Sequence, residues 1–70
     1  MDTSTELALR AVIRGLCQSK AIDGGQVRGV VSALKAEAGA AMDRHEPEIA
    51  KALVALCKGI RADQSLDEPN

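Results

Sequence analysis

The chain has 70 residues, a formal net charge of −1 at pH 7 and a hydrophobic fraction of 46%, without a single Phe, Trp or Tyr. This length allows one domain at most, and the low net charge and the missing aromatic stacking platforms argue against a nucleic-acid partner. The polar start Met1–Thr5 predicts no signal peptide, and no apolar run approaches the ~20 residues of a membrane span, so we expect a soluble, cytoplasmic protein.

The first predicted helix covers residues 4–19. Thr3 is expected to be its N-cap, and Glu6 three residues later would complete a capping box. Arg10 and Arg14 fall on the polar stripe and are expected to be exposed. The opposite, buried face is predicted from apolar residues at ~100° per residue: Ala8, Leu9, Val12, Ile13, Leu16 and Cys17.

The segment DGGQ, residues 23–26, is expected to begin a second helix over residues 24–44. Asp23 and Gln26 stand at the two positions of a capping box, and Ile22 and Val27 at those of a hydrophobic staple. A phosphate-binding loop would need a Lys-Ser or Lys-Thr pair, or a Gly-x-Gly-x-x-Gly run, after a strand. The segment has neither motif, so we predict a helix start.

The second helix is expected to bury one apolar face and to carry small residues on its back. Small residues spaced three or four apart would let another helix approach closely. The small-residue back consists of Gly29, Ala33, Ala36 and Ala40. The buried face is predicted to contain Val27, Val30, Val31, Leu34, Ala38, Ala41 and Met42.

The third predicted helix begins at Pro47, because proline is favoured at the first helical position, and ends near residue 62. Residues 63–70 lack periodicity and are predicted to be a flexible tail. Short connections make successive helices antiparallel neighbours. We therefore expect an all-α fold with one domain over residues 1–62, either a three-helix bundle or a small helical homodimer. The inner face of the third helix is predicted to contain Ile49, Leu53, Leu56, Cys57 and Ile60.

The residues that could carry chemistry favour structural roles. His45 is the only histidine and is expected to end a helix or pack at its rim, rather than act as a base or pH switch. Cys17 and Cys57 fall among Leu and Ile, where a thiol stays protonated, although an oxidisable pair remains an alternative. No carboxylate or histidine stands at metal-ligand spacing. We predict a non-enzyme with no catalytic residue, metal, cofactor or small-molecule substrate.

Two segments resemble known sequences. Residues 9–34 resemble the helical hairpins of many short bacterial and phage proteins. The segment DRHEPEIAK, residues 43–51, is similar to a segment of the theta accessory subunit of bacterial DNA polymerase. Each match covers only part of the chain, and neither implies a function for it.

The favoured hypothesis is a small helical interaction or regulatory protein that binds a partner protein through helix surfaces. Such a protein would be an accessory subunit or a phage-type inhibitor of host machinery, and we expect it to form a homodimer. Leu7 and Val54 lie off the predicted buried faces. With Gly29, Ala33, Ala36 and Ala40 they are the candidate interface residues, and Arg10, Arg14, Lys51 and Lys58 form the candidate exposed charged stripes.

Two alternatives remain. The first two helices could form a DNA-binding helix-turn-helix in which Arg28 and Lys35 of the second helix reach the groove. Cys17 and Cys57 could instead sense redox state by pairing. The sequence leaves open the identity of the partner, the choice between monomer and dimer, and any role of His45 beyond structure.

Overall fold

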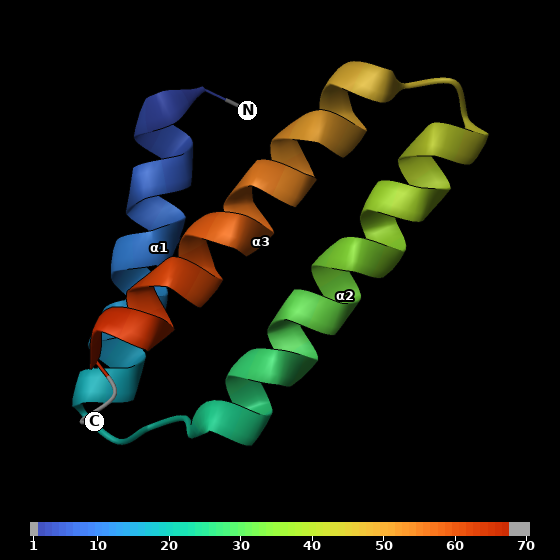
Figure 1. Ribbon diagram of the computed structural model, residues 1–70. Helices are drawn as coiled ribbons and strands as arrows, with labels where there is room; N and C mark the ends of the chain where they lie inside the picture. The colour runs from blue at the N-terminus through green and yellow to red at the C-terminus, as the bar shows by residue number, and fades with distance from the viewer. Residues whose placement is uncertain (1, 68–70) are drawn as a thin grey trace.

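The structure, a computed structural model, describes residues 2–67, with side chains over residues 2–64. Three helices follow one another: α1 (Thr3–Gln18), α2 (Gly24–Asp43) and α3 (Pro47–Asp67). Successive helices run in opposite directions, and α3 lies between α1 and α2 (Figure 1). Residues 2–67 contain no strand. The predicted all-α fold with three helices is therefore confirmed.

The first two helices begin with side-chain caps. The α2 capping box is present as predicted: the Gln26 amide donates to Asp23 Oδ1, and the Asp23 amide donates to Gln26 Oε1, both at 2.8 Å. In α1, Asp2 and not Thr3 is the N-cap, and its carboxylate accepts from the Thr5 amide at 2.7 Å. That hydrogen bond lowers the pKa of Asp2. The predicted Thr3 cap is wrong because a carboxylate one residue earlier already satisfies the first turn.

The first two helices end in the same backbone motif. At the end of α2 the Glu46 amide donates to the Ala41 carbonyl (2.9 Å) and the His45 amide to the Met42 carbonyl (3.0 Å). These two bonds form a Schellman motif, in which His45 takes a left-handed conformation with φ of 60°. Lys20 does the same after α1, with φ of 64°. His45 thus lies at a helix end, as expected, and glycine would fit both positions with less strain.

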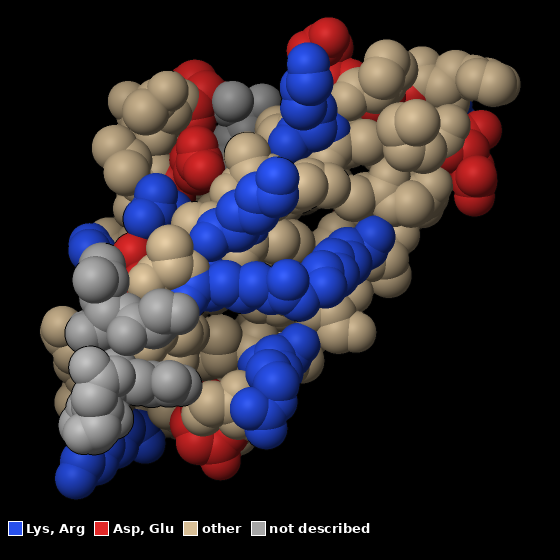
Figure 2. All heavy atoms as spheres, viewed as in Figure 1, with Lys and Arg blue, Asp and Glu red and all other residues tan. Residues whose placement is uncertain are grey.

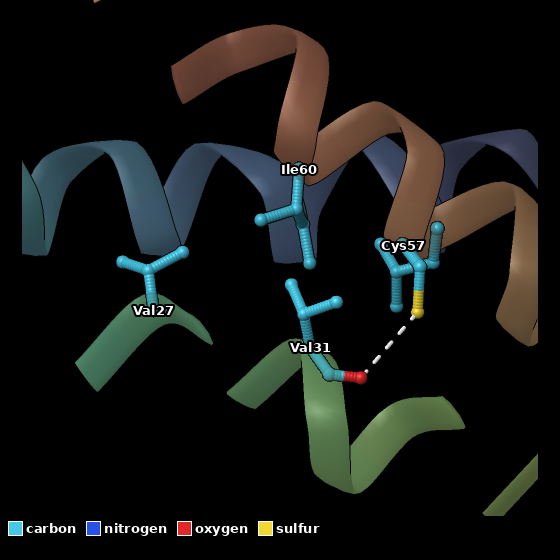
Figure 3. Close-up of a cluster of buried hydrophobic side chains, with 5 residues drawn as sticks. Val27, Val31, Cys57 and Ile60 are labelled. Atoms are coloured by element: carbon cyan, nitrogen blue, oxygen red, sulfur yellow. Dashed lines mark hydrogen bonds between the residues drawn. The ribbon is translucent and has the colours of Figure 1, made fainter. Parts of the chain in front are cut away.

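The core lies between α2 and α3. Val27 and Val31 of α2 point toward Cys57 and Ile60 of α3, and the Cys57 thiol donates to the Val31 carbonyl at 3.8 Å (Figure 3). The largest completely buried side chains are Leu56 and Ile60. Small buried residues extend this contact toward the second connection, where the two backbones approach closely: Ala38, Ala41 and Ala50.

The small-residue back of α2 is not part of this contact. Gly29, Ala33 and Ala36 are exposed, and Ala40 is half-buried. A Cβ added at Gly29 would meet nothing within 4 Å. Close helix packing therefore occurs on the apolar face of α2, and the opposite face has no neighbour within residues 2–67.

The packing of α1 differs from the sequence expectation. No side chain within Thr3–Gln18 is fully buried, and only Ile13 and Cys17 pack against the core cluster. Helix α1 contacts α3 but hardly touches α2, so the part of its apolar face that turns toward α2 stays uncovered. The prediction of a broad buried face on α1 is therefore wrong for four residues that are exposed: Ala8, Leu9, Val12 and Leu16.

Two further expectations need correction. Three residues at the edges of the predicted buried faces are exposed: Val30, Met42 and Ile49. The neighbouring helices cover only the middle of each apolar face. Helix α3 also continues to Asp67 instead of ending near residue 62, so the predicted tail begins inside the helix. Residues 68–70 lie outside the described part of the chain. The physical reason for the longer helix is an ion pair between Asp63, in this additional segment, and Arg10 of α1.

Candidate interaction surfaces

An ion pair joins α1 to the last turns of α3. Arg10 Nε donates to Asp63 Oδ2 at 3.0 Å, and Arg10 Nη2 donates to Asp63 Oδ1 at 2.9 Å. The geometry is bidentate, with 26% of the Arg10 side chain and 6% of the Asp63 side chain exposed. The hydrogen bond from Arg10 holds the pKa of Asp63 below its ordinary value, and the positive charge adds to this effect. The prediction that Arg10 belongs to an exposed stripe is therefore wrong.

Gly59 makes room for this ion pair. A Cβ at position 59 would lie 2.8 Å from both Cδ and Nε of Arg10, which is closer than a carbon atom can approach without displacing the side chain. Arg10 therefore crosses α3 at the one residue of that turn that lacks a side chain. No local pattern predicts this contact, because Arg10 and Asp63 are 53 residues apart in sequence.

Three exposed apolar residues of α1 form one continuous row, which we call the α1 apolar stripe, whereas the exposed Leu7 lies outside it. It consists of Leu9, Val12 and Leu16, whose exposed fractions are 40%, 58% and 39%. At 3.6 residues per turn, Leu9 and Leu16 lie about 100–120° around the helix from Arg10. Ile13, which packs against the core cluster, lies between Arg10 and the stripe around the helix, so the stripe borders the core-facing side of α1. Val30 of α2 is exposed as well.

A groove runs between α2 and α3. At one end it has a volume of about 460 Å³, and its walls carry Arg28 and Lys35 from α2 and Arg61 and Gln64 from α3. We call this end the basic groove. The apolar side chains at its floor belong to the core, so cationic groups stand at the rim of an otherwise hydrophobic contact.

The other end of the same groove, which we call the apolar groove, has a volume of about 580 Å³. Lys35 lines both ends, so the two adjoin at this residue along the hairpin. Met42 and Val54 flank the apolar groove, and Lys51 lies at its edge. Its remaining lining residues are small or apolar: Ala38, Gly39, Pro47 and Ala50.

Lys and Arg side chains gather on this side of α2 and α3, while the acidic side chains visible in the same view lie mainly toward its rim (Figure 2). On α3 the spacing of Lys51, Lys58 and Arg61 places them on one exposed stripe. The ion pairs formed within residues 2–64 engage Arg10 and Arg44 and none of the five cations Arg28, Lys35, Lys51, Lys58 and Arg61. The sequence, with a net charge of −1, hides this local concentration of charge.

The predicted interface residues do not meet in one place. Leu7 is exposed on α1, Val54 flanks the apolar groove, and the small residues Gly29, Ala33 and Ala36 lie on the opposite side of α2 from the core. Of the predicted charged stripes, Lys51 and Lys58 share the exposed side of α3, whereas Arg14 is exposed on α1. The sequence reasoning missed the α1 apolar stripe, because periodicity shows that a face is apolar but not whether another helix covers it.

The potentially reactive side chains lie apart from these surfaces. Cys17 and Cys57 are both free thiols, Cys17 accepting a hydrogen bond from Gln64 Nε2 at 3.4 Å, and His45 is exposed. Within the described residues, no three His, Cys, Asp or Glu side chains come together in a way that could hold a metal ion. None of the helices in residues 2–67 combines the length and apolar character that crossing a bilayer requires. Comparison with protein-family models, curated proteins and solved structures gave no match to this chain.

Proposed function

We propose that the protein is a small, non-catalytic helical interaction protein that docks against other protein chains and also forms a homodimer. The observation that carries this proposal is the α1 apolar stripe. Scattered exposed apolar residues are common on protein surfaces, but a continuous row of them marks an interaction surface. An accessory subunit or a compact inhibitor of a larger machine would have this character.

A second copy of the chain is the occupant that fits the α1 apolar stripe. A two-fold dimer places the same surface of each copy against the other, so one self-complementary row of Leu and Val is sufficient. Burying a Leu or Val side chain from full exposure contributes about 1.5–3 kcal/mol, and each of the three half-exposed side chains of the stripe offers roughly half of that. Domains of this size commonly gain stability by such association.

The first experiment is the solution mass by size exclusion with light scattering, detected by refractive index because the chain has no Trp or Tyr. We expect about twice the chain mass of 7.3 kDa. Leu16→Glu should produce a monomer, because it places a charge within the stripe. Gln18→Glu makes the same charge on the opposite side of α1 and should leave the dimer intact. A wild-type monomer at concentrations well above micromolar would contradict the homodimer.

A DNA-binding regulator is the second candidate, supported by the cations Arg28 and Lys35 on the exposed side of α2. In the apolar groove beside them only Lys35 and Lys51 could donate to a phosphate, and the other lining side chains are small or apolar, which favours a protein partner. Titration with duplex DNA at two salt concentrations separates the candidates, because binding to phosphates weakens steeply as salt rises. Salt-sensitive binding that is lost in Lys35→Glu would favour the DNA-binding candidate.

A further inference from the structure

We propose that the groove between α2 and α3 binds an acidic amphipathic helix of a partner protein. This inference rests on the proposed function as a protein-binding module and names the class of its partner. It concerns a different surface from the α1 apolar stripe, so the groove remains available when two copies associate through α1.

The shape of the groove fits a helix. Its two ends share Lys35 and follow the hairpin lengthwise, between two antiparallel helices. An amphipathic helix binds such a groove by laying its apolar side chains along the floor. The alanines and Gly39 leave space at the apolar end, and a Cβ at Gly39 would meet nothing within 4 Å. Met42 and Val54 are exposed there and would be covered by the partner.

The charges of the groove select acidic side chains on the partner. Arg28 and Lys35 of α2 line the groove seven residues apart, and Lys51 and Arg61 of α3 line its other wall. Seven residues make two helical turns, or about 10.5 Å. In a helix lying in the groove, every seventh residue also faces the same side, at the same interval of two turns. Glu or Asp at heptad spacing on one flank of the partner helix would therefore meet Arg28 and Lys35, and acidic residues on its other flank would meet Lys51 and Arg61.

A phosphate backbone fits this surface less well. The cations would suit phosphates at the basic groove, but the same surface continues over Met42 and Val54, which would desolvate a phosphate without offering it a hydrogen bond. The chain also has no aromatic side chain on which bases could stack. An acidic amphipathic helix can offer carboxylates to the basic groove and apolar side chains to the apolar groove at the same time.

The probe is a fluorescently labelled synthetic helix of about five turns with Leu at the a and d heptad positions and Glu at e and g. Its binding to the wild-type protein is followed by anisotropy at two salt concentrations. We expect the wild type to bind this peptide, and Lys35→Glu and Val54→Asp each to weaken binding by about tenfold or more. Lys20→Glu is the matched control for charge reversal, because Lys20 lies in the α1–α2 connection and lines neither end of the groove.

Three outcomes would overturn the inference. The first is no binding of the Leu–Glu peptide, and the second is equal binding of a peptide with Lys in place of every Glu. The third is that a duplex DNA binds more tightly than the peptide and is insensitive to Val54→Asp. Helicity of each variant is checked by circular dichroism, and Met42→Asp replaces Val54→Asp if that variant is unfolded. The homodimer is tested separately by mass, so failure of the groove leaves the proposed function standing.

Discussion

Helix α3 contacts its two neighbours by different means. Against α2 it buries apolar side chains over most of its length, including Leu56 and Ile60, with alanines where the backbones approach. Its contact with α1 consists of the bidentate ion pair between Asp63 and Arg10 and of two half-buried apolar side chains contributed by α1. Apolar burial therefore stabilises the α2–α3 hairpin, whereas a polar contact largely sets the position of α1.

This difference predicts an order of opening. A segment with few buried apolar contacts opens at lower free energy than the core. Since α1 has no fully buried side chain, it should detach before α2 and α3 separate.

Leu56→Ala should destabilise the whole protein most. Leu56 is 2% exposed and lies in the core cluster, so its truncation leaves a cavity and costs about 2–5 kcal/mol. Urea unfolding followed by circular dichroism measures the loss. Val12→Ala, on the exposed stripe of α1, is the matched control and should change the free energy of unfolding of the isolated chain by well under that amount. Similar losses for both variants would show that α1 is as firmly held as the hairpin.

His45→Gly should stabilise the hairpin by about 1 kcal/mol, because a left-handed residue with a Cβ is strained by about 1–2 kcal/mol relative to glycine. Glycine loses part of that gain through its freer unfolded chain. Lys20→Gly removes the same strain between α1 and α2 and should raise the global free energy of unfolding less, since α1 detaches first. Thermal unfolding compares the two variants, and a larger gain from Lys20→Gly would contradict the proposed order.

The two glycines Gly15 and Gly59 provide a matched pair in helix interiors. Gly15→Ala should stabilise α1 by up to about 1 kcal/mol, because the added Cβ meets nothing within 4 Å. Gly59→Ala gains the same helix propensity but displaces Arg10 from Asp63. We expect faster hydrogen exchange of the α1 amides in Gly59→Ala and slower exchange in Gly15→Ala. Equal protection of α1 in both variants would show that the ion pair tolerates the shift.

Acid should release α1 before it affects the hairpin. Arg10 lowers the pKa of Asp63 in the folded state, so the ion pair contributes fully above the unfolded pKa of about 3.9. The contribution is lost as the pH falls through the lower, folded pKa. Hydrogen exchange of α1 and a carboxyl NMR titration of Asp63 follow this loss.

Arg10→Gln should return the pKa of Asp63 toward its ordinary value and flatten the acid response of α1. Asp2 also has a lowered pKa and the same sign of pH dependence, through its hydrogen bond with the Thr5 amide. Asp2→Asn keeps an N-cap side chain without a titrating carboxyl, and so separates the two groups. An unchanged acid response in Arg10→Gln would assign the effect to another carboxyl.

The parts of the fold that could be predicted are those encoded locally. The capping box of Asp23 and Gln26 and the helix start at Pro47 depend on residues within one turn. Contact between Arg10 and Asp63 could not be predicted, because it depends on how two distant helices pack against each other. The same contact explains why α3 passes residue 62 without an apolar pattern: Asp63 is held by α1 and not by the core.

The candidate surfaces were only partly accessible to sequence reasoning. Val54, Lys51 and Lys58 were identified because they lie off the apolar face of their own helix. The combination of Val54 and Lys51 with Lys35 into one groove depends on the rotation of α2 against α3, which periodicity within a single helix does not define. The exposure of Leu9 and Leu16 depends on the gap between α1 and α2, and no residue in either helix encodes that gap alone.

The missing side chain at position 59 has a consequence for how this sequence can diverge. A larger residue there would force the Arg10 side chain to shift away from its present path to Asp63, and this weakens the selection for an arginine at 10 and an aspartate at 63. The three positions are therefore expected to change together over evolution. A set of related sequences would show this as covariation among 10, 59 and 63, which would record the docking of α1 without any structure.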